Sequence, residues 1–355
     1  MLITQQSRCT PILLVASLLI MCILNGCTLG AMPTAPQAEQ LEMESSPRRG
    51  ALQVEPLPIL FQQPTQFFVD SDDLLWVAQL NGGENEGNGQ VVRVDMQTGE
   101  QEMVLDKLDK PTGIARVDDT LWVATRDAIL KLNLANEAAT VETVLSDLPN
   151  NGRSNGTLTV TPAGKLLYET SGNRVDVDSG KVWELDPLTN ERRIVATGLK
   201  GGYAHVFDSA GRLWLTEIAD GAVEGVTLPG EINLILPTDD EAPDFGWPRC
   251  YGKELAGPDC TGVRAAQITL PTHSTPTSID LSPFSPNTLL VALWVTGEVI
   301  EVSFTVGEEG AVELGEPQTF LSELRTPQHI DTQTDNSVLI SDFATGEIFR
   351  VWYLE

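Results

Sequence analysis

The sequence is poor in basic residues, histidine, cysteine and aromatic side chains. Its 355 residues include 22 Lys and Arg against 50 Asp and Glu, which gives a formal net charge of −28. Such an acid excess repels nucleic acid, so we expect no nucleic-acid partner. With three His and five Cys, the chain has no His/Cys metal cluster. It also lacks a phosphate-binding Gly-rich loop and a Gly-x-Ser-x-Gly nucleophile elbow.

Long apolar runs are scarce too, and the one present lies at the N-terminus. Residues 11–24 are apolar and follow Arg8, but the run is shorter than the ~20 residues that a membrane span needs. It is typical of a secretory signal, and its end, Leu24-Asn25-Gly26-Cys27, resembles a bacterial lipobox. We therefore expect a lipoprotein-type signal peptide over residues 1–26 and lipid on Cys27. An ordinary cleaved signal is the alternative.

The signal predicts an exported protein, lipid-anchored in the bacterial cell envelope and facing the periplasm or the cell surface. Residues 27–50 are poor in aromatic and β-branched residues, which is typical of a flexible tether. The folded domain is expected over 51–355, as a monomer. Its cysteines, Cys250 and Cys260, lie ten residues apart, and in an oxidising compartment we expect them to form a disulfide.

The domain is built from a repeat. Leu75, Leu121, Leu167 and Leu213 stand in similar short apolar strands 46 residues apart, and the pattern returns at Leu289 and Leu339. A second strand of alternating polar and apolar residues follows each one, and a third element often precedes the next unit. Radial repetition of such sheets predicts an all-β fold, a six-bladed β-propeller of four-stranded antiparallel sheets.

The pattern also predicts how the ring closes and where a ligand binds. No outer strand follows the last unit, whereas residues 52–60 precede the first, so we expect the N-terminal strand to complete the last sheet. An insertion of about residues 236–270 contains the stretch "PDFGWPRCYG" (243–252). Loops from each outer strand to the next inner strand surround one end of the channel. We expect a ligand site at that mouth, with the insertion over or beside it.

Some stretches resemble a known family. "GEIN" (230–233), followed by "DFGWPRCYG" (244–252), is similar to the soluble PQQ-dependent glucose/sorbosone dehydrogenases, which include the aldose sugar dehydrogenases. The resemblance covers roughly residues 52–353. It implies a six-bladed propeller with a PQQ cofactor over the channel, a supporting Ca²⁺, and a small sugar or aldehyde as substrate. The implied site residues are Lys200, Gly201, Tyr203 and Trp247 for the cofactor, and Glu231 for Ca²⁺.

Several of the family's functional residues are replaced. Ser154 stands where the family has a general-base His, and Ser cannot act as a base at neutral pH without a partner. His205 and His329, near channel-mouth loops, are the candidates to replace that base. Lys200 and Gly201 stand for Arg and Asn, and Lys lacks the two-pronged grip of Arg on a carboxylate.

These replacements leave more than one function open. The first is a PQQ- and Ca²⁺-dependent sugar or aldehyde dehydrogenase, with weakened or lost catalysis as one form of it. The alternative is a non-catalytic propeller that binds a glycan, a peptide or a protein partner at the cell envelope. A metal-dependent lactonase is a third hypothesis, and it needs inward carboxylates that the sequence does not place.

Overall fold

The computed structural model describes residues 50–354, apart from 84, 137, 139, 151–154, 174–175, 219–221 and 224–225. The predicted signal peptide, Cys27 and nearly all of the predicted tether lie outside the described residues, and so does Ser154. The described part contains no helix of the length and apolarity needed to cross a membrane.

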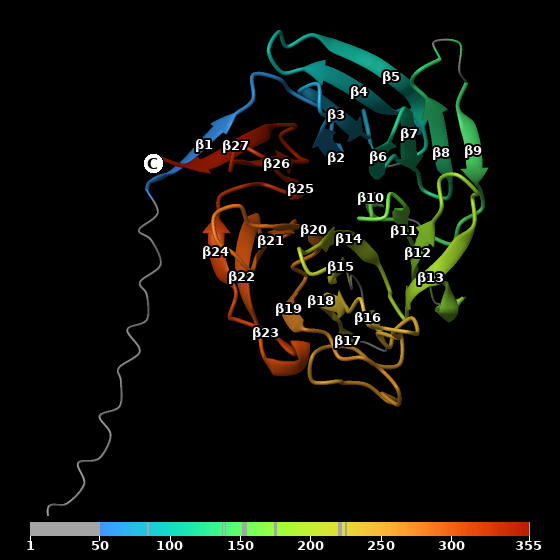
Figure 1. The fold of residues 1–355 in the computed structure, drawn as a ribbon, viewed down its shortest axis with the longest axis vertical. Helices are drawn as coiled ribbons and strands as arrows, with labels where there is room; N and C mark the ends of the chain where they lie inside the picture. Colours follow the sequence, from blue (N-terminus) through green and yellow to red (C-terminus); the bar gives the residue numbers. More distant parts are fainter. Residues whose placement is uncertain are drawn as a thin grey trace, which may run out of the picture. The chain divides into compact units, whose positions relative to one another are not determined.

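The chain forms six antiparallel sheets around a central channel, which confirms the predicted six-bladed propeller (Figure 1). Each blade starts with an inner strand that lines the channel and continues outward. Blade 1 comprises β2 (Pro64–Val69), β3 (Leu74–Gln79), β4 (Gly89–Asp95) and β5 (Gln101–Leu108). Blade 2 comprises β6 (Gly113–Val117), β7 (Thr120–Ala124), β8 (Ile129–Asn133) and β9 (Glu142–Leu145). Blade 3 comprises β10 (Thr159–Val160), β11 (Leu166–Thr170), β12 (Lys181–Leu185) and β13 (Arg192–Thr197).

The other three blades carry the additions. Blade 4 comprises β14 (Gly202–Phe207), β15 (Leu213–Glu217), β18 (Pro229–Ile235) and β19 (Ile268–Thr272), with the hairpin β16 (Ala222–Val223) and β17 (Val226–Thr227) between its second and third strands. Blade 5 comprises β20 (Pro276–Leu281), β21 (Thr288–Leu293), β22 (Glu298–Val306) and β24 (Gln318–Leu321), and β23 (Val312–Leu314) pairs with the far end of β22. Blade 6 comprises β25 (Pro327–Thr332), β26 (Val338–Asp342), β27 (Ile348–Tyr353) and β1 (Leu52–Pro56).

The repeated leucines form the core between blades. All six are at most 3% exposed, because each stands on the second strand of its blade, in contact with a neighbouring sheet. A recurrent turn fixes two of these strands. The Asp70 carboxylate accepts hydrogen bonds from the backbone N–H of Leu74 and from the indole N–H of Trp76. In blade 4, Asp208 bonds Arg212 N–H and Trp214 in the same way.

The ring closes as the sequence predicts. Strand β1 pairs antiparallel with β27, from Leu52 opposite Tyr353 to Pro56 opposite Phe349, and Figure 1 shows the two strands side by side. The strand is shorter than the expected span to Leu60. Pro56 and Pro58 lack the N–H that a strand needs for its ladder, which limits how far the pairing can continue.

Cross-channel hydrogen bonds occupy the middle of the ring. The Gln66 side chain accepts from the backbone N–H groups of Ile114 and Leu158 at 2.8 and 3.0 Å and donates to the Leu158 carbonyl at 2.8 Å. Gln328 donates to the Tyr203 hydroxyl at 2.8 Å. The bonds from Gln66 to Leu158 and from Gln328 to Tyr203 connect blades that are not neighbours, and we call Gln66, Gln328 and Tyr203 the polar plug.

Candidate functional site

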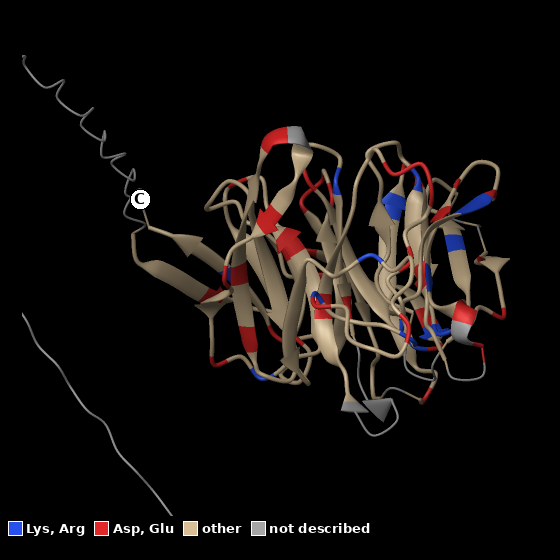
Figure 2. Ribbon diagram, turned by 90° about the horizontal axis from the view of Figure 1, so that it is seen from below, with Lys and Arg blue, Asp and Glu red and all other residues tan. Residues whose placement is uncertain are grey.

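The channel has two ends, which different turns surround. We call the loop end the one where segments such as 109–112, 198–201 and 273–275 lead into inner strands. The hairpin end is the other, where turns such as 70–73 and 208–211 join inner strands to second strands. Acidic residues lie on both ends of the ring (Figure 2), and Asp and Glu outnumber Lys and Arg in the sequence.

The stretch "DFGWPRCYG" lies along the seam between blades 3 and 4. Backbone bonds of 3.0 Å from Phe245 N–H to Thr197 O, and of 2.8 Å from Trp247 N–H to Gly198 O, hold it beside the end of β13. Phe245 is 2% exposed and packs into the core between these blades. The predicted disulfide between Cys250 and Cys260 is present, with a Cα–Cα distance of 5.1 Å.

A buried carboxylate pair lies under this stretch at the loop end. Glu217 at the end of β15 stands directly opposite Glu231 on β18, and the two residues are 4% and 3% exposed. Asn233 lies between them. Its amide donates to Glu217 at 3.2 Å, while its Oδ1 is buried without a hydrogen-bond partner among the described atoms. We call Glu217, Glu231 and Asn233 the carboxylate seam.

The surroundings of the carboxylate seam explain its electrostatics. Burial raises the pKa of Glu231 to about 7, although hydrogen bonds from Gly252 N–H and from Asn233 act against the rise. Burial, and then the charge of Glu231, raise the pKa of Glu217 well above its usual range. The Lys200 backbone N–H donates to Glu217 at 2.7 Å, and the Lys200 charge lowers the pKa of that carboxyl. The seam can therefore hold a shared proton or a cation.

The structure brings Lys200, Glu231 and Trp247 to this seam. Gly172 N–H donates to the Lys200 carbonyl, and the Trp247 ring lies so close to Gly172 that an added Cβ would be 3.1 Å from it. Trp247 is 7% exposed and packs on Leu228. Its indole N–H is buried without a partner among the described atoms. The ring is thus a covered wall of the seam rather than an open platform.

The other predicted residues lie in the channel wall. Gly201 and Tyr203 lead into and along the inner strand of blade 4, and the Tyr203 hydroxyl belongs to the polar plug. His205 Nε2 is 2.7 Å from Glu169 Oε1, and both side chains are buried. Burial raises the pKa of Glu169. His205 therefore does not lie at the channel mouth as expected, and its imidazole ring is buried.

His329 is also inside the channel. Burial lowers its pKa to about 3, and its ring meets Phe67 edge-on at a centroid distance of 5.0 Å. It is therefore neutral and a weak base at neutral pH. Neither His205 nor His329 is among the described groups that shift the pKa of Glu217 or Glu231.

Sequence reasoning missed three residues of this region, namely Glu169, Glu217 and Asn233. Two of them carried a signal. Asn233 stands in the "GEIN" motif, and Glu217 ends the strand that precedes it. Glu217 lies opposite Glu231 because of the antiparallel register of β15 and β18. Residue spacing alone does not predict this register, because an insertion separates the two strands.

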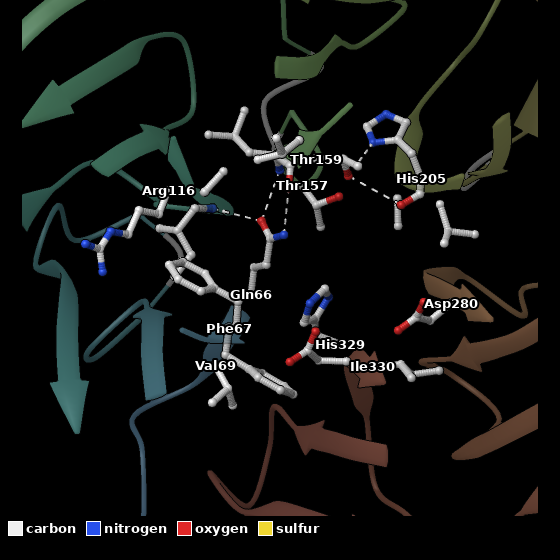
Figure 3. A pocket seen from close by; sticks show the side chains of 18 of the residues that line it. Gln66, Phe67, Val69, Arg116, Thr157, Thr159, His205, Asp280, His329 and Ile330 are labelled. Carbon is white, nitrogen blue, oxygen red and sulfur yellow. Dashed lines mark hydrogen bonds between the residues drawn. The ribbon is translucent and has the colours of Figure 1, made fainter. Parts of the chain in front are cut away.

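A cavity lies at the hairpin end, away from the expected mouth (Figure 3). It has a volume of about 750 Å³ and is lined by the hairpin-end halves of the inner strands. Gln66 of the polar plug is one of its lining residues.

Among solved structures, the propeller resembles several sugar dehydrogenases. The PQQ domain of pyranose dehydrogenase from Coprinopsis cinerea is 14% identical over 87% of this chain and 98% of its own, with a TM-score of 0.69. The PQQ-bound aldose sugar dehydrogenase of Streptomyces coelicolor is 16% identical over 87% and 100%, with a TM-score of 0.65. The soluble aldose sugar dehydrogenase of Escherichia coli is 15% identical over 85% and 99%, with a TM-score of 0.64.

The chain has the fold of these dehydrogenases. The fold expected from the family resemblance is therefore confirmed. The sequence matches no known family model and no curated protein, and at 14–16% identity the likeness concerns the fold.

Proposed function

We propose that the protein is a PQQ- and Ca²⁺-dependent dehydrogenase of a small sugar or aldehyde, held at the cell envelope by lipid on Cys27. The observation that carries the proposal is the carboxylate seam, where two buried carboxylates face each other beside Lys200. Two like charges are costly in a protein interior unless a proton or a cation accompanies them. The likeness to quinone-dependent sugar dehydrogenases in fold supports the same assignment.

The seam has the donor set for calcium. Ca²⁺ takes oxygen ligands from carboxylates and amide carbonyls. Glu217 and Glu231 supply carboxylates, and Asn233 Oδ1 is a buried acceptor without a partner among the described atoms. These residues would hold the ion, and the ion would lower the pKa of both carboxyls.

The wall above the seam suits an anionic ligand. The Lys200 ammonium supplies a positive charge, and the unpartnered indole N–H of Trp247 supplies a donor. Both groups would hold the carboxylates of the quinone, and Gly201, without a side chain, leaves room beside them. When bound, PQQ supplies the acceptor for two electrons. The chain's own part is to orient it, to exclude water and to take a proton from the substrate hydroxyl.

A non-catalytic carbohydrate-binding propeller is the second candidate. The observation that favours it is the position of the predicted bases, since His205 pairs with Glu169 and His329 lies inside the channel. A propeller of this kind would keep the cation and the sugar but perform no oxidation.

The first experiment adds PQQ and Ca²⁺ to the purified protein. The proposal predicts the absorption spectrum of a bound quinone, and reduction of an artificial electron acceptor when glucose or another aldose is added. Glu231→Gln should remove both, and Glu313→Gln, which neutralises an exposed acid, should remove neither. A bound quinone without turnover of any aldose or aldehyde would select the second candidate, and no bound quinone would reject the dehydrogenase.

The envelope anchor is tested separately. Cys27→Ala should shift the protein from the membrane fraction to the soluble fraction or block its processing, because the lipid would have no attachment point. Unchanged membrane association of Cys27→Ala would contradict the lipid anchor without bearing on the dehydrogenase.

A further inference from the structure

The cavity at the hairpin end has the size of a ligand site. Its volume of about 750 Å³ lies within the range of roughly 300–1,000 Å³ that holds small molecules. Side chains such as Val69, Ile114 and Ile330 give it apolar walls. Its lining contains none of the residues of the carboxylate seam, so it is a site distinct from the proposed dehydrogenase site.

Two carboxylates from adjacent blades face this compartment. Asp280 is the last residue but one of the inner strand of blade 5, and Asp331 has the same place on that of blade 6. Figure 3 shows the Asp280 carboxylate pointing toward the open centre, near His329. Asp280 accepts a bond of 2.7 Å from Thr332 N–H, and Asp331 accepts one of 2.6 Å from Gln333. Both carboxylates are thus held in fixed positions.

No cation of the described chain compensates this pair. Burial raises the pKa of Asp280 to about 6, and burial together with the Asp280 charge raises the pKa of Asp331 to about 7. Arg116 lines the same cavity, but it pairs with Asp70 at 3.0 Å. His329 is neutral there, and the His205 ring pairs with Glu169. Asp280 and Asp331 are half-buried and border the open volume, and like charges this close to each other are stabilised by a positive charge between them, for which the open volume has room.

We propose that this cavity binds a small organic cation, a protonated amine with an apolar body, whose ammonium lies between Asp280 and Asp331. An organic cation fits better than a metal ion for two reasons. The volume is far larger than an ion needs, and its walls are partly apolar. The amine head meets the carboxylates, and the apolar body covers the cavity wall.

Calorimetric titration of the full-length protein with n-hexylamine, protonated at neutral pH, tests the site. n-Hexanol is the uncharged probe of similar shape, and calcium chloride is the inorganic cation. We expect one molecule of hexylammonium bound per chain and no binding of hexanol. Asp331→Asn and Asp280→Asn should each weaken hexylammonium binding by about tenfold, since each removes one charge partner. Glu313→Gln removes the same charge from the exposed surface and should leave the affinity unchanged.

Thermal melting is a second measurement of hexylammonium binding, for the case that the binding is too weak for calorimetry. Without ligand, Asp331→Asn should melt at a higher temperature than the wild type, because it relieves the repulsion between the two carboxylates. Hexylammonium should raise the melting temperature of the wild type and of Glu313→Gln, but not that of Asp331→Asn. Three results would each overturn the proposal. Hexanol and hexylammonium could raise the melting temperature equally, or hexylammonium could raise that of all variants equally. The third is Ca²⁺ binding that depends on Asp331 while hexylammonium does not bind.

Discussion

Glu231 shows how one side chain joins the two stretches of sequence that carry the family resemblance. It stands in "GEIN", and its carboxylate accepts a hydrogen bond from the backbone N–H of Gly252, the last residue of "DFGWPRCYG". Glu231 also stands directly opposite Glu217 on the neighbouring strand. A single residue thus fixes the inserted loop to blade 4 and contributes to the candidate cation site.

The ionisation of Glu231 makes stability depend on pH. Its pKa of about 7 in the folded protein exceeds the usual value of 4.5, so the folded state keeps a proton that the unfolded chain has lost. Folding therefore becomes less favourable as the pH rises from 4.5 through 7. Glu231→Gln should remove this cost and stabilise the metal-free protein by about 2–3 kcal/mol at pH 8. Urea unfolding at pH 5 and pH 8 measures it, with Glu313→Gln as the control.

That prediction has a clear contrary outcome. The gain of Glu231→Gln over the wild type should grow between pH 5 and pH 8. A constant gain, or a loss at both values, would mean that the carboxyl is not protonated in the folded state in this range.

His205 is expected to matter for stability whatever its role in chemistry. Removing one partner of a buried polar pair leaves the other group without a partner, which costs about 1–3 kcal/mol. His205→Asn should therefore lower the free energy of unfolding by about that amount, because Glu169 stays buried. His273→Asn changes an exposed histidine, and it should alter stability by less than about 0.5 kcal/mol. Similar losses in the two variants, measured by urea unfolding, would contradict the pairing.

At the residue scale, the sequence predicted candidate site residues better than the burial and contacts of their side chains. The family resemblance predicted Lys200, Glu231 and Trp247 as site residues. The Lys200 backbone N–H donates to Glu217 opposite Glu231, and the role of the three residues in one site stays a prediction. The burial of Trp247 and the pairing of His205 with Glu169 were not predictable. Both depend on which neighbouring residue covers a side chain. The residue spacing within one blade does not predict the contacts between blades.

At the scale of elements, the inserted loop packs along the boundary between blades 3 and 4. Residues 236–267 connect β18 with β19, and the part that includes Phe245 packs into the core. The expectation that this insertion lies beside the mouth is met by its central stretch. Its apolar residues made this location foreseeable, because Phe, Trp and Cys side chains favour buried positions.

The disulfide should stabilise this loop. It closes a loop of ten residues in sequence separation, and loop-closure entropy then predicts a contribution of about 2–3 kcal/mol. The double variant Cys250→Ser, Cys260→Ser should lose about that amount in denaturant unfolding. In the exported wild-type protein, thiol labelling without reductant should find neither cysteine. Labelling of both would show that the loop lacks its covalent closure.

At the scale of the whole molecule, the strongest sequence signal was the repeat. The 46-residue spacing, the alternating strands and the missing last strand together predicted six blades and the N-terminal closure. The polar plug and the cavity at the hairpin end were not predictable, since they depend on side chains such as Gln66 that meet across the channel from distant repeats. The carboxylate seam and the cavity at the hairpin end each carry a separate proposal.

Ring closure by β1 is open to a direct test. Deleting residues 50–56 removes the strand that covers β27, so the edge of β27 becomes available for pairing with other chains. The deletion should lower the melting temperature and cause association, visible as larger species in light scattering. Deleting residues 28–48, the predicted tether, should change neither. A truncated ring as stable and as monomeric as the wild type would contradict the closure.

The central claim is that the carboxylate seam is the cation-dependent cofactor site, and melting curves of the purified protein with Ca²⁺ and PQQ test it most directly. Ca²⁺ should raise the melting temperature, and PQQ should raise it further only when Ca²⁺ is present. A ligand that binds only the folded state stabilises it by about 2.7 kcal/mol at a hundred times its dissociation constant. The double variant Glu217→Gln, Glu231→Gln should show neither increment, whereas Glu313→Gln should show both. If neither ligand shifts the wild-type curve, or if the double variant responds as the wild type does, the assignment of the seam is wrong.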